Sequence, residues 1–579
     1  MGILPLSMPP TTCKRYLARP LFNKFFPAVA ASGPQIVTAV RSFSNGSQKW
    51  AQVTRTQGST ATHDDTSARE KVIVLGSGWG GYTFSRRLSE KLHSCAIVSP
   101  RSYFVFTPLL TETAAGNLDF SSIVEQLRDS KSKVDFTQAV AREVNFKDKV
   151  VVCEASVVKS GVTESPRVNE NERKFEEGPE TGAMRGKEHL RKWEQGQTFA
   201  VPYDRLIIAV GCVSETFNTP GVRENALFFK DIGDSRRVKR RMRECFELAM
   251  LPNTTEEMQR WLLHFAIVGA GPTGTELAAT LRDFINRDIA KLYPGLKGKA
   301  RITLYDVAPT VLSMFDKSLS KYAMETMRKE GIEIKTAHHV QELRWGRPNT
   351  GGSHEMDPKG CLTLNTKEEG DVGVGMCVWA TGNAINKFVK DSLDRVGVFP
   401  SPSALMKGGA KTGSDVEKST WNVRKAPKSG ALLVDGQFRV QLESEDGKIA
   451  VLQDVFAIGD NAMPETGAPP ATAQATSQEA KWLADRFNHR DFDSAGNFSF
   501  RNMGALAYIG DAKALMQIPH EDVDGRRRNP YLPEGLRGRT AWFVWQVAYL
   551  RMSVSWRNRV RIVCRWIINR VFGSDISRF

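Results

Sequence analysis

Two glycine-rich turns, each set between an apolar run and an amphipathic segment, constrain the fold of this 579-residue chain more than any other feature. In the first turn, KVIVLGSGWGG, the glycines of interest are Gly76, Gly78 and Gly81. In the second, HFAIVGAGPTG, they are Gly269, Gly271 and Gly274. Both turns have the spacing G-x-G-x-x-G, and a second apolar run follows each amphipathic segment. Two such βαβ units predict an α/β protein with two Rossmann-type nucleotide-binding domains.

Each glycine of the motif has its own steric reason. The first allows the tight turn, the second lets a pyrophosphate approach the backbone, and the third lets helix and strand pack closely. Exposed N–H groups at the start of the helix then favour the negative charge of the phosphate. One such motif is weak evidence, because glycine-rich turns also arise for purely structural reasons. Two of them in the same strand and helix context predict two dinucleotide sites.

The residue that ends the second strand of each unit helps to identify the dinucleotide. In the second unit this residue is Asp306, whose carboxylate can bind ribose hydroxyls and would repel a 2′-phosphate. The second unit therefore favours NADH. The first unit has Ser99 at the corresponding position, so its contact with the adenosine ribose stays unassigned.

Three further apolar runs complete the pattern of a flavoprotein. The run VFAIGDNA contains Gly459 and Asp460, and a carboxylate at this position can accept hydrogen bonds from the ribityl chain of FAD. The runs LIIAVG (206–211) and VWATG (378–382) end in small residues, where the chain crosses between domains close to a bound cofactor. Each run alone could be an ordinary core strand, but their order predicts one FAD and one NADH site.

The formal net charge of +16 would ordinarily suggest nucleic acid or an anionic surface as a partner. Almost all of this charge lies in residues 1–63 and 536–579, so the body between them is nearly neutral. A neutral body disfavours binding to nucleic acid. Residues 1–63 lack acids and are rich in Ser, Thr and Ala, which is typical of a mitochondrial transit peptide processed near Arg41. A disordered tail is the alternative.

The eight cysteines include no C-x-x-C pair, and the nine histidines show no metal-binding spacing. The sequence therefore predicts neither a disulfide framework nor a metal site, and it is consistent with a reducing compartment. The segment DVDG at 522–525 lacks the ligands of an EF-hand loop, so direct calcium dependence is not expected. Two charged or Gly-rich segments, 159–197 and 400–430, are predicted to be long solvated loops.

The tail at 541–572 combines tryptophans with many arginines. Its longest uncharged stretch, Thr540 to Leu550, is shorter than the roughly 20 residues of a membrane-spanning helix. After this stretch, a helical arrangement places one apolar seam along Trp556, Val560, Val563, Cys564, Ile567 and Val571. An apolar seam flanked by arginines predicts a helix that lies in the membrane interface. A core helix or a dimer contact is the alternative.

With these features, residues 70–579 resemble the type II, or alternative, NADH:ubiquinone oxidoreductases of mitochondria, of the fungal or plant type. The most specific segments are VSPRSYFVFTPLL, IVGAGPTGTELAATL, VWATGN, FAIGDNA, PPATAQATSQEAKWLA and the tail from SWRNRV to VFGSDISR. The resemblance implies a FAD domain, a NADH domain and a C-terminal membrane-binding domain. The expected division is a transit peptide at 1–63, FAD domain at 64–225 and 391–490, NADH domain at 226–390 and C-terminal domain at 491–579.

The resemblance also implies the site residues. FAD would contact Gly76, Gly78, Gly81, Thr107, Gly459 and Asp460. NADH would contact Gly269, Gly271, Gly274, Glu276, Asp306 and Gly382, with Glu276 near the nicotinamide end. Ubiquinone would contact Gln474 and Gln478, and the candidate catalytic residues are Glu276 and Gln474. Glu276 could equally be an acid stabilised by the helix dipole, and the two glutamines could be surface amides one helical turn apart.

The implied activity is electron transfer from NADH through FAD to ubiquinone without proton pumping, by a peripheral protein of the mitochondrial inner membrane. The sequence does not tell which face of that membrane it occupies, and a homodimer stays open. A disulfide reductase would need a redox cysteine pair in the first helix, and a sulfide:quinone reductase would need cysteines at the flavin. Cys361 and Cys377 lie in the NADH half. A signalling flavoprotein of the apoptosis-inducing-factor kind would need a basic body.

Overall fold

The structure, a computed structural model, describes most of the chain beyond the N-terminal segment. The described residues are 69–128, 134–156, 197–348, 360–393, 395–407, 419–465, 467–519 and 535–574. The predicted transit peptide, nearly all of the loop at 159–197 and the DVDG segment lie outside these residues. None of the helices within these ranges is both long and apolar enough to cross a membrane.

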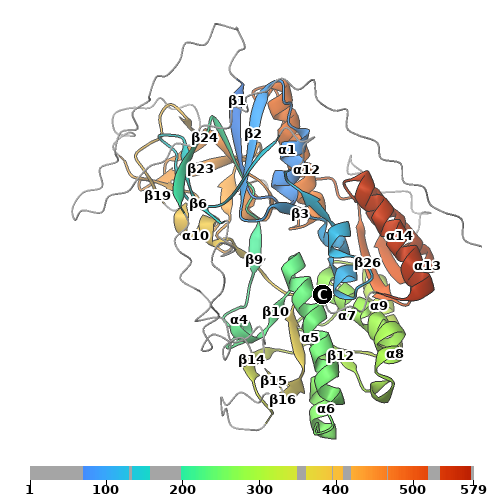
Figure 1. The fold of residues 1–579 in the computed structure, drawn as a ribbon. Helices are drawn as coiled ribbons and strands as arrows, with labels where there is room; N and C mark the ends of the chain where they lie inside the picture. Colours follow the sequence, from blue (N-terminus) through green and yellow to red (C-terminus); the bar gives the residue numbers. More distant parts are fainter. Residues whose placement is uncertain are drawn as a thin grey trace, which may run out of the picture.

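The first glycine turn lies in a large sheet built from both ends of the chain (Figure 1). The strand β1 (Glu70–Leu75) pairs in parallel with β2 (His93–Ser99) and with β8 (Arg205–Ile208). On its other edge β8 pairs in parallel with β24 (Ile449–Ala457). The helices α1 (Trp79–Arg87) and α12 (Ala473–His489) pack side by side. Segments whose paired residues are 249 positions apart thus form one Rossmann-type unit, because parallel pairing places their carboxyl ends at the same edge.

The second glycine turn belongs to a separate parallel sheet. Its strand order is β10, β17, β11, β12, β13. These strands span Leu227–Phe228, Met376–Trp379, His264–Val268, Arg301–Asp306 and Ile332–Thr336. The helix α7 (Pro272–Phe284) follows the turn, and α5 (Ile232–Met250) packs near β10 and β17. The prediction of two Rossmann-type domains is therefore confirmed.

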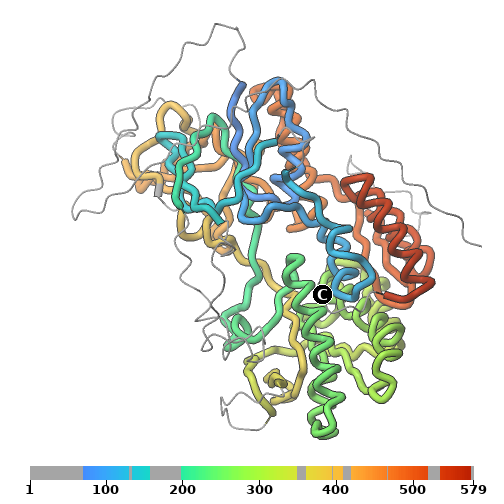
Figure 2. The backbone as a smooth tube through the Cα atoms, in the orientation of Figure 1, coloured from blue at the N-terminus to red at the C-terminus, as the bar shows by residue number. Residues whose placement is uncertain are grey.

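A short two-stranded sheet joins the two units. The strand β9 (Cys212–Ser214) pairs antiparallel with β18 (Asn383–Ile385). The runs LIIAVG and VWATG lead directly into these strands, so the two chain crossings lie side by side. Figure 2 shows the two crossings running between the upper and lower halves of the molecule.

The prediction that residues 400–430 form a solvated loop is wrong at both of its ends. The strand β20 (Ala404–Met406) pairs with β24, and β21 (Trp421–Val423) pairs with β23 (Arg439–Ser444). The indole of Trp421 is fully buried and packs edge-on against Phe399. Strands of three residues carry too little periodicity to be seen in sequence, since their stability comes from distant partners. Residues 408–418 lie outside the described part of the chain.

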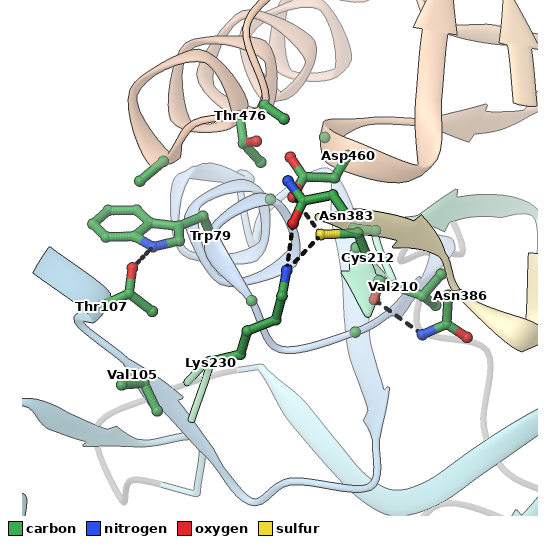
Figure 3. A pocket seen from close by; sticks show the side chains of 18 of the residues that line it. Trp79, Val105, Thr107, Val210, Cys212, Lys230, Asn383, Asn386, Asp460 and Thr476 are labelled. Atoms are coloured by element: carbon green, nitrogen blue, oxygen red, sulfur yellow. Dashed lines mark hydrogen bonds between the residues drawn. The ribbon is translucent and has the colours of Figure 1, made fainter. Parts of the chain in front are cut away.

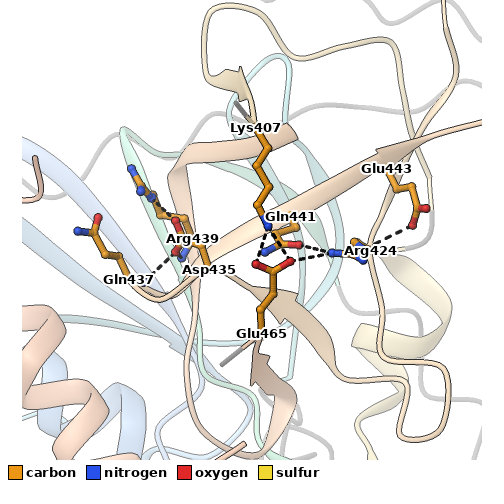
Figure 4. A network of polar contacts seen from close by, with 8 residues as sticks. All are labelled: Lys407, Arg424, Asp435, Gln437, Arg439, Gln441, Glu443 and Glu465. Atoms are coloured by element: carbon orange, nitrogen blue, oxygen red, sulfur yellow. Dashed lines mark hydrogen bonds and ion pairs between the residues drawn. The ribbon is translucent and has the colours of Figure 1, made fainter. Parts of the chain in front are cut away.

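An ion-pair network fastens this region to the rest of the sheet (Figure 4). The ammonium of Lys407 donates to Glu465 at 2.7 Å, and the guanidinium of Arg424 donates to the other oxygen of Glu465 at 2.9 Å. Arg424 also donates to the side chain of Gln441 at 2.8 Å. Exposed pairs of this kind contribute about 0–1 kcal/mol each, so the buried Trp421 holds the segment more than these charges do.

The C-terminal part packs against the second Rossmann unit. Its sheet consists of β26 (Ala505–Gly510), β27 (Lys513–Gln517) and β28 (Gly535–Gly538). Two helices follow, α13 (Arg539–Met552) and α14 (Trp556–Phe572), and they lie together at one side of the molecule in Figures 1 and 2. The strand β26 packs on α7, so the C-terminal sheet sits beside the second glycine turn.

The helix α14 buries Asn558 and Ile562 against the body and leaves several apolar side chains exposed. The amide of Asn558 donates to Val124 O at 2.9 Å, and Arg565 pairs with Asp119 at 2.9 Å. The outward side chains of Trp556, Val560, Ile567, Val571 and Phe572 are exposed by 44–83%. All of these except Phe572 belong to the seam predicted from sequence, while Val563 of that seam is half-buried. A helix with this orientation exposes an apolar face that water does not favour.

Candidate functional site

A cavity of about 900 Å³ lies where the two Rossmann units and the C-terminal part meet. Its walls include the first glycine turn, the start of α7 and the turn after β24. Leu506 and Tyr549 line it from the C-terminal part. The cavity thus touches all three parts of the fold, and its volume is within the range of small-molecule and cofactor sites.

The first glycine turn has the geometry that a pyrophosphate site requires. Gly76 has a φ of +107°, and a Cβ there would lie 2.3 Å from Ala209 O. A Cβ on Gly81 would lie 2.0 Å from Gly76 O, so that only glycine lets α1 approach the strand. By contrast, no described atom lies within 4 Å of a Cβ on Gly78, which lines the cavity. The open space at Gly78 is where the motif places a phosphate.

The second glycine turn repeats this arrangement. Gly269 has a φ of +109°, a Cβ on Gly274 would lie 1.9 Å from Gly269 O, and a Cβ on Gly271 would meet no described atom within 4 Å. The carboxylate of Asp306 accepts hydrogen bonds from the backbone N–H groups of Ala270 and Ala308. These contacts fix the carboxylate beside the turn, and a carboxylate has further lone pairs for a ribose hydroxyl. The residues present therefore fit a dinucleotide.

The polar groups expected to hold the flavin gather on the same cavity (Figure 3). The indole of Trp79 donates to Thr107 Oγ1 at 3.0 Å, which fixes the hydroxyl at the cavity wall. Gly459 has a φ of +77° and lets the chain turn so that Asp460 lines the cavity. Of the six residues predicted to contact FAD, only Gly81 lies away from the cavity wall, because its role is packing.

Of the residues predicted to contact NADH, Glu276 and Gly382 line the cavity. Gly382 has a φ of +74°, and a Cβ there would lie 2.8 Å from Cβ of Glu215. Glu276 is 7% exposed and accepts a hydrogen bond from Tyr508 N at 3.1 Å. Burial raises the pKa of Glu276 to about 8. A carboxyl that is largely protonated at neutral pH can donate a proton, which an ordinary glutamate on a helix surface cannot.

The two glutamines predicted to contact ubiquinone point elsewhere. The amide of Gln478 donates to Arg501 O at 2.8 Å and accepts from Arg501 N at 3.0 Å. Gln474 makes the same kind of pair, donating to Gly504 O and accepting from Met503 N. Neither is among the residues found to line the cavity, although their neighbours Ala473 and Thr476 are. Contact between these amides and ubiquinone stays a prediction.

Sequence reasoning missed several residues at this site. Tyr549, on α13, lines the cavity, and burial and the charge of Glu276 raise its pKa well above 10. Tyr508 donates its backbone N–H to Glu276. Lys230 and Cys212 also line the cavity. The aromatic run at 541–550 was a signal for Tyr549, but its electrostatic interaction with Glu276 depends on how the C-terminal part docks.

Comparisons with known proteins agree with this arrangement. Residues 70–398 match the sequence family described as pyridine nucleotide-disulphide oxidoreductase, and residues 502–575 match the family described as NDH2 C-terminal domain. The chain is 28% identical to an external alternative NAD(P)H-ubiquinone oxidoreductase B1, mitochondrial, from Solanum tuberosum, covering 88% of this chain and 91% of that protein. An internal alternative NAD(P)H-ubiquinone oxidoreductase A1, mitochondrial, from Arabidopsis thaliana is 29% identical, with 88% and 86% covered.

A solved structure shares the fold. The structure of NDH2 from Plasmodium falciparum in complex with NADH superposes with a TM-score of 0.65 at 22% identity, covering 88% of this chain and 100% of that chain. At this level of identity the likeness concerns the fold.

Proposed function

The chain belongs to the pyridine nucleotide-disulphide oxidoreductase family, and we propose that within it the protein is a type II NADH:ubiquinone oxidoreductase with bound FAD. The similarity to mitochondrial alternative oxidoreductases along 88% of the chain confirms the resemblance predicted from the motifs. It does not favour a sulfide:quinone reductase or a signalling flavoprotein. The single observation that carries the proposal is the shared cavity, which both Rossmann units and the C-terminal part line.

The chain's own residues would bind, orient and shield the reactants. FAD, when bound, would accept a hydride from NADH and pass two electrons to ubiquinone. The glycine turns would bind the two pyrophosphates, Asp306 would bind the NADH ribose, and Asp460 would bind the ribityl chain. Glu276, protonated and buried beside Tyr549, would hold a proton within the cavity, where the reduction of a quinone consumes protons.

The proposal also includes a position on the membrane. The relatives' names place them in mitochondria, and we infer a peripheral site on the inner membrane, where ubiquinone is dissolved. The exposed apolar face of α14 supports this inference, because it joins apolar residues with flanking arginines suited to anionic headgroups. A homodimer that buries this face is the competing arrangement.

The test of the function uses the purified full-length protein. Its absorbance spectrum should show a bound flavin that extraction identifies as FAD, and NADH should reduce a water-soluble ubiquinone analogue at a rate typical of enzymes. Sulfide should not replace NADH as the donor. Sealed proteoliposomes should take up only the protons needed to form quinol. A protein without flavin, or with quinone reduction too slow to measure and salt-sensitive DNA binding, would overturn the proposal.

Replacing two outward residues of α14 should release the enzyme from membranes. The double variant Ile567→Asp, Val571→Asp places charges on side chains that are 59% and 68% exposed, so the fold should be unaffected. We expect binding to vesicles of phosphatidylcholine and cardiolipin to fall at least about tenfold, since each charge removes apolar contact and repels anionic lipid. Co-sedimentation measures the bound fraction.

A matched control is Leu405→Asp, which changes an equally exposed leucine, 57% exposed, on β20. It should bind vesicles as the unchanged protein does. If the α14 variant also bound fully, but changed from dimer to monomer in analytical ultracentrifugation, the face would be a subunit contact and the membrane assignment would be wrong.

A further inference from the structure

Lys230 occupies a fixed position in the cavity. It immediately precedes α5, whose first turn is closed by a capping box between Asp231 and Asp234. The backbone N–H of Lys230 donates to Asp234 Oδ2 at 2.7 Å, so this box also holds Lys230. Its side chain then extends toward β9 and β18 (Figure 3). There Nζ donates to Asn383 Oδ1 at 2.7 Å and to Cys212 Sγ at 3.1 Å.

The thiol of Cys212 stands between two opposite charges. It accepts from Lys230 Nζ and donates to Asp460 Oδ2 at 3.0 Å. Burial and the nearby Asp460 carboxylate raise the pKa of Cys212 to about 11, so at neutral pH the thiol keeps the proton that it donates. The sulfur therefore acts as a spacer that keeps the ammonium from forming a direct ion pair with Asp460.

The positive charge of Lys230 is therefore not neutralised by an ion pair with Asp460. In the part of the chain that the structure describes, both of its hydrogen-bond partners are neutral groups, and an ammonium has three donors. A cation with no carboxylate in contact exerts its field on a ligand bound beside it. An electron-rich ring or a carbonyl oxygen would be stabilised there.

The partners of Lys230 identify which end of the cofactors it faces. One partner, Cys212, donates to Asp460, on the turn proposed to hold the ribityl chain. The other partner is Asn383, next to Gly382 on the NADH side. The pyrophosphates are expected at Gly78 and Gly271, at the starts of other helices. A position common to both dinucleotides but away from both phosphates is where isoalloxazine and nicotinamide meet.

We propose that Lys230 is a cofactor-binding residue that holds a positive charge against the isoalloxazine end of FAD, and that Cys212 is the positioning residue that keeps this charge unpaired. The proposal rests on the proposed function. A cation at this place favours the electron-rich, reduced state of the flavin, so it raises the midpoint potential.

The test measures the midpoint potential of the flavin in purified holoenzyme by anaerobic reductive titration with a reference dye. In Lys230→Met, the ratio of reduced to oxidised flavin at the wild-type midpoint should fall at least about tenfold, which for two electrons is about 30 mV. Lys230→Arg should keep most of the potential, because it keeps the charge. Cys212→Ala should lower it in the same direction, because the ammonium can then pair directly with Asp460.

Lys448→Met is the matched control, since it removes a lysine charge from the exposed end of the hairpin between β23 and β24. Its potential should equal that of the wild type. An unchanged potential in Lys230→Met with full flavin content would overturn the proposal. If Lys230→Met retains no flavin, the midpoint potential of Cys212→Ala is the test instead, and an unchanged potential in that variant would overturn the proposal. A wild-type protein that holds no flavin would instead contradict the proposed function.

Discussion

Replacing Gly78 with alanine is expected to abolish the retention of FAD while leaving the free energy of unfolding of the apoprotein unchanged. The backbone at Gly78 has a φ of −75° and a ψ of −166°, which alanine adopts without strain. A Cβ there meets no described atom within 4 Å, but it occupies the space that the motif leaves for a pyrophosphate. We expect the affinity for FAD to fall about 100-fold or more, equivalent to about 2.8 kcal/mol.

The matched variant is Gly81→Ala, three residues further on. Its Cβ would lie 2.0 Å from Gly76 O and 3.0 Å from Val74, so the helix α1 would have to move away from its strand. Overpacking of this kind costs about 1–3 kcal/mol in the fold itself. Urea unfolding of the apoproteins and flavin absorbance of the purified proteins separate the two effects. Equal losses of stability in both variants would show that Gly78 is a structural glycine and not a phosphate contact.

The glycine turns could be predicted from the sequence because the contacts that require glycine are made within the turn or with the adjoining strand. Gly76, Gly81, Gly269 and Gly274 are required by contacts within a few residues or with the adjoining strand, and the spacing alone encodes these contacts. The same holds for Asp306, which ends its strand beside the turn. The two Rossmann units follow from such local patterns.

The remaining parts of the site depend on long-range docking. The chain Lys230–Cys212–Asp460 joins two residues that are 18 positions apart to a third that lies 248 positions from Cys212. None of the three residues belongs to a spacing motif that predicts the other two. The glutamines of α12 were correctly placed on one helix face, but the backbone of 501–504 takes their hydrogen bonds. A helical wheel finds the seam of α14 but not its direction, which Asn558 and other inward polar groups determine.

Replacing Glu276 with glutamine is expected to lower kcat for quinone reduction about 100-fold, with the KM for NADH little changed. A correctly placed proton donor contributes about 10²–10⁴-fold to rate, and glutamine keeps the shape and the hydrogen bond from Tyr508 N but carries no acidic proton. Wild-type kcat should fall as the pH rises through about 8, where Glu276 loses its proton, whereas the variant should lack this step. Steady-state rates between pH 6 and 9 (about three pH units) measure both effects.

The same substitution should stabilise the protein at alkaline pH. Folding raises the pKa of Glu276 from 4.5 to about 8, so the native state binds a proton that the unfolded state releases between these values. Below pH 4.5 this group therefore does not reduce the stability of the wild type. As the pH rises from 4.5 toward 8, the free energy of unfolding of the wild type falls by about 5 kcal/mol. Urea unfolding should show that the free energy of unfolding of the variant increases relative to that of the wild type over this range.

Glu112→Gln is the control: burial raises the pKa of Glu112 to about 7, but this residue is not among those that line the cavity. It should show the stability gain without the loss of kcat. A loss of kcat equal to that of Glu276→Gln would mean that burial of a carboxyl, and not its position in the cavity, limits the reaction.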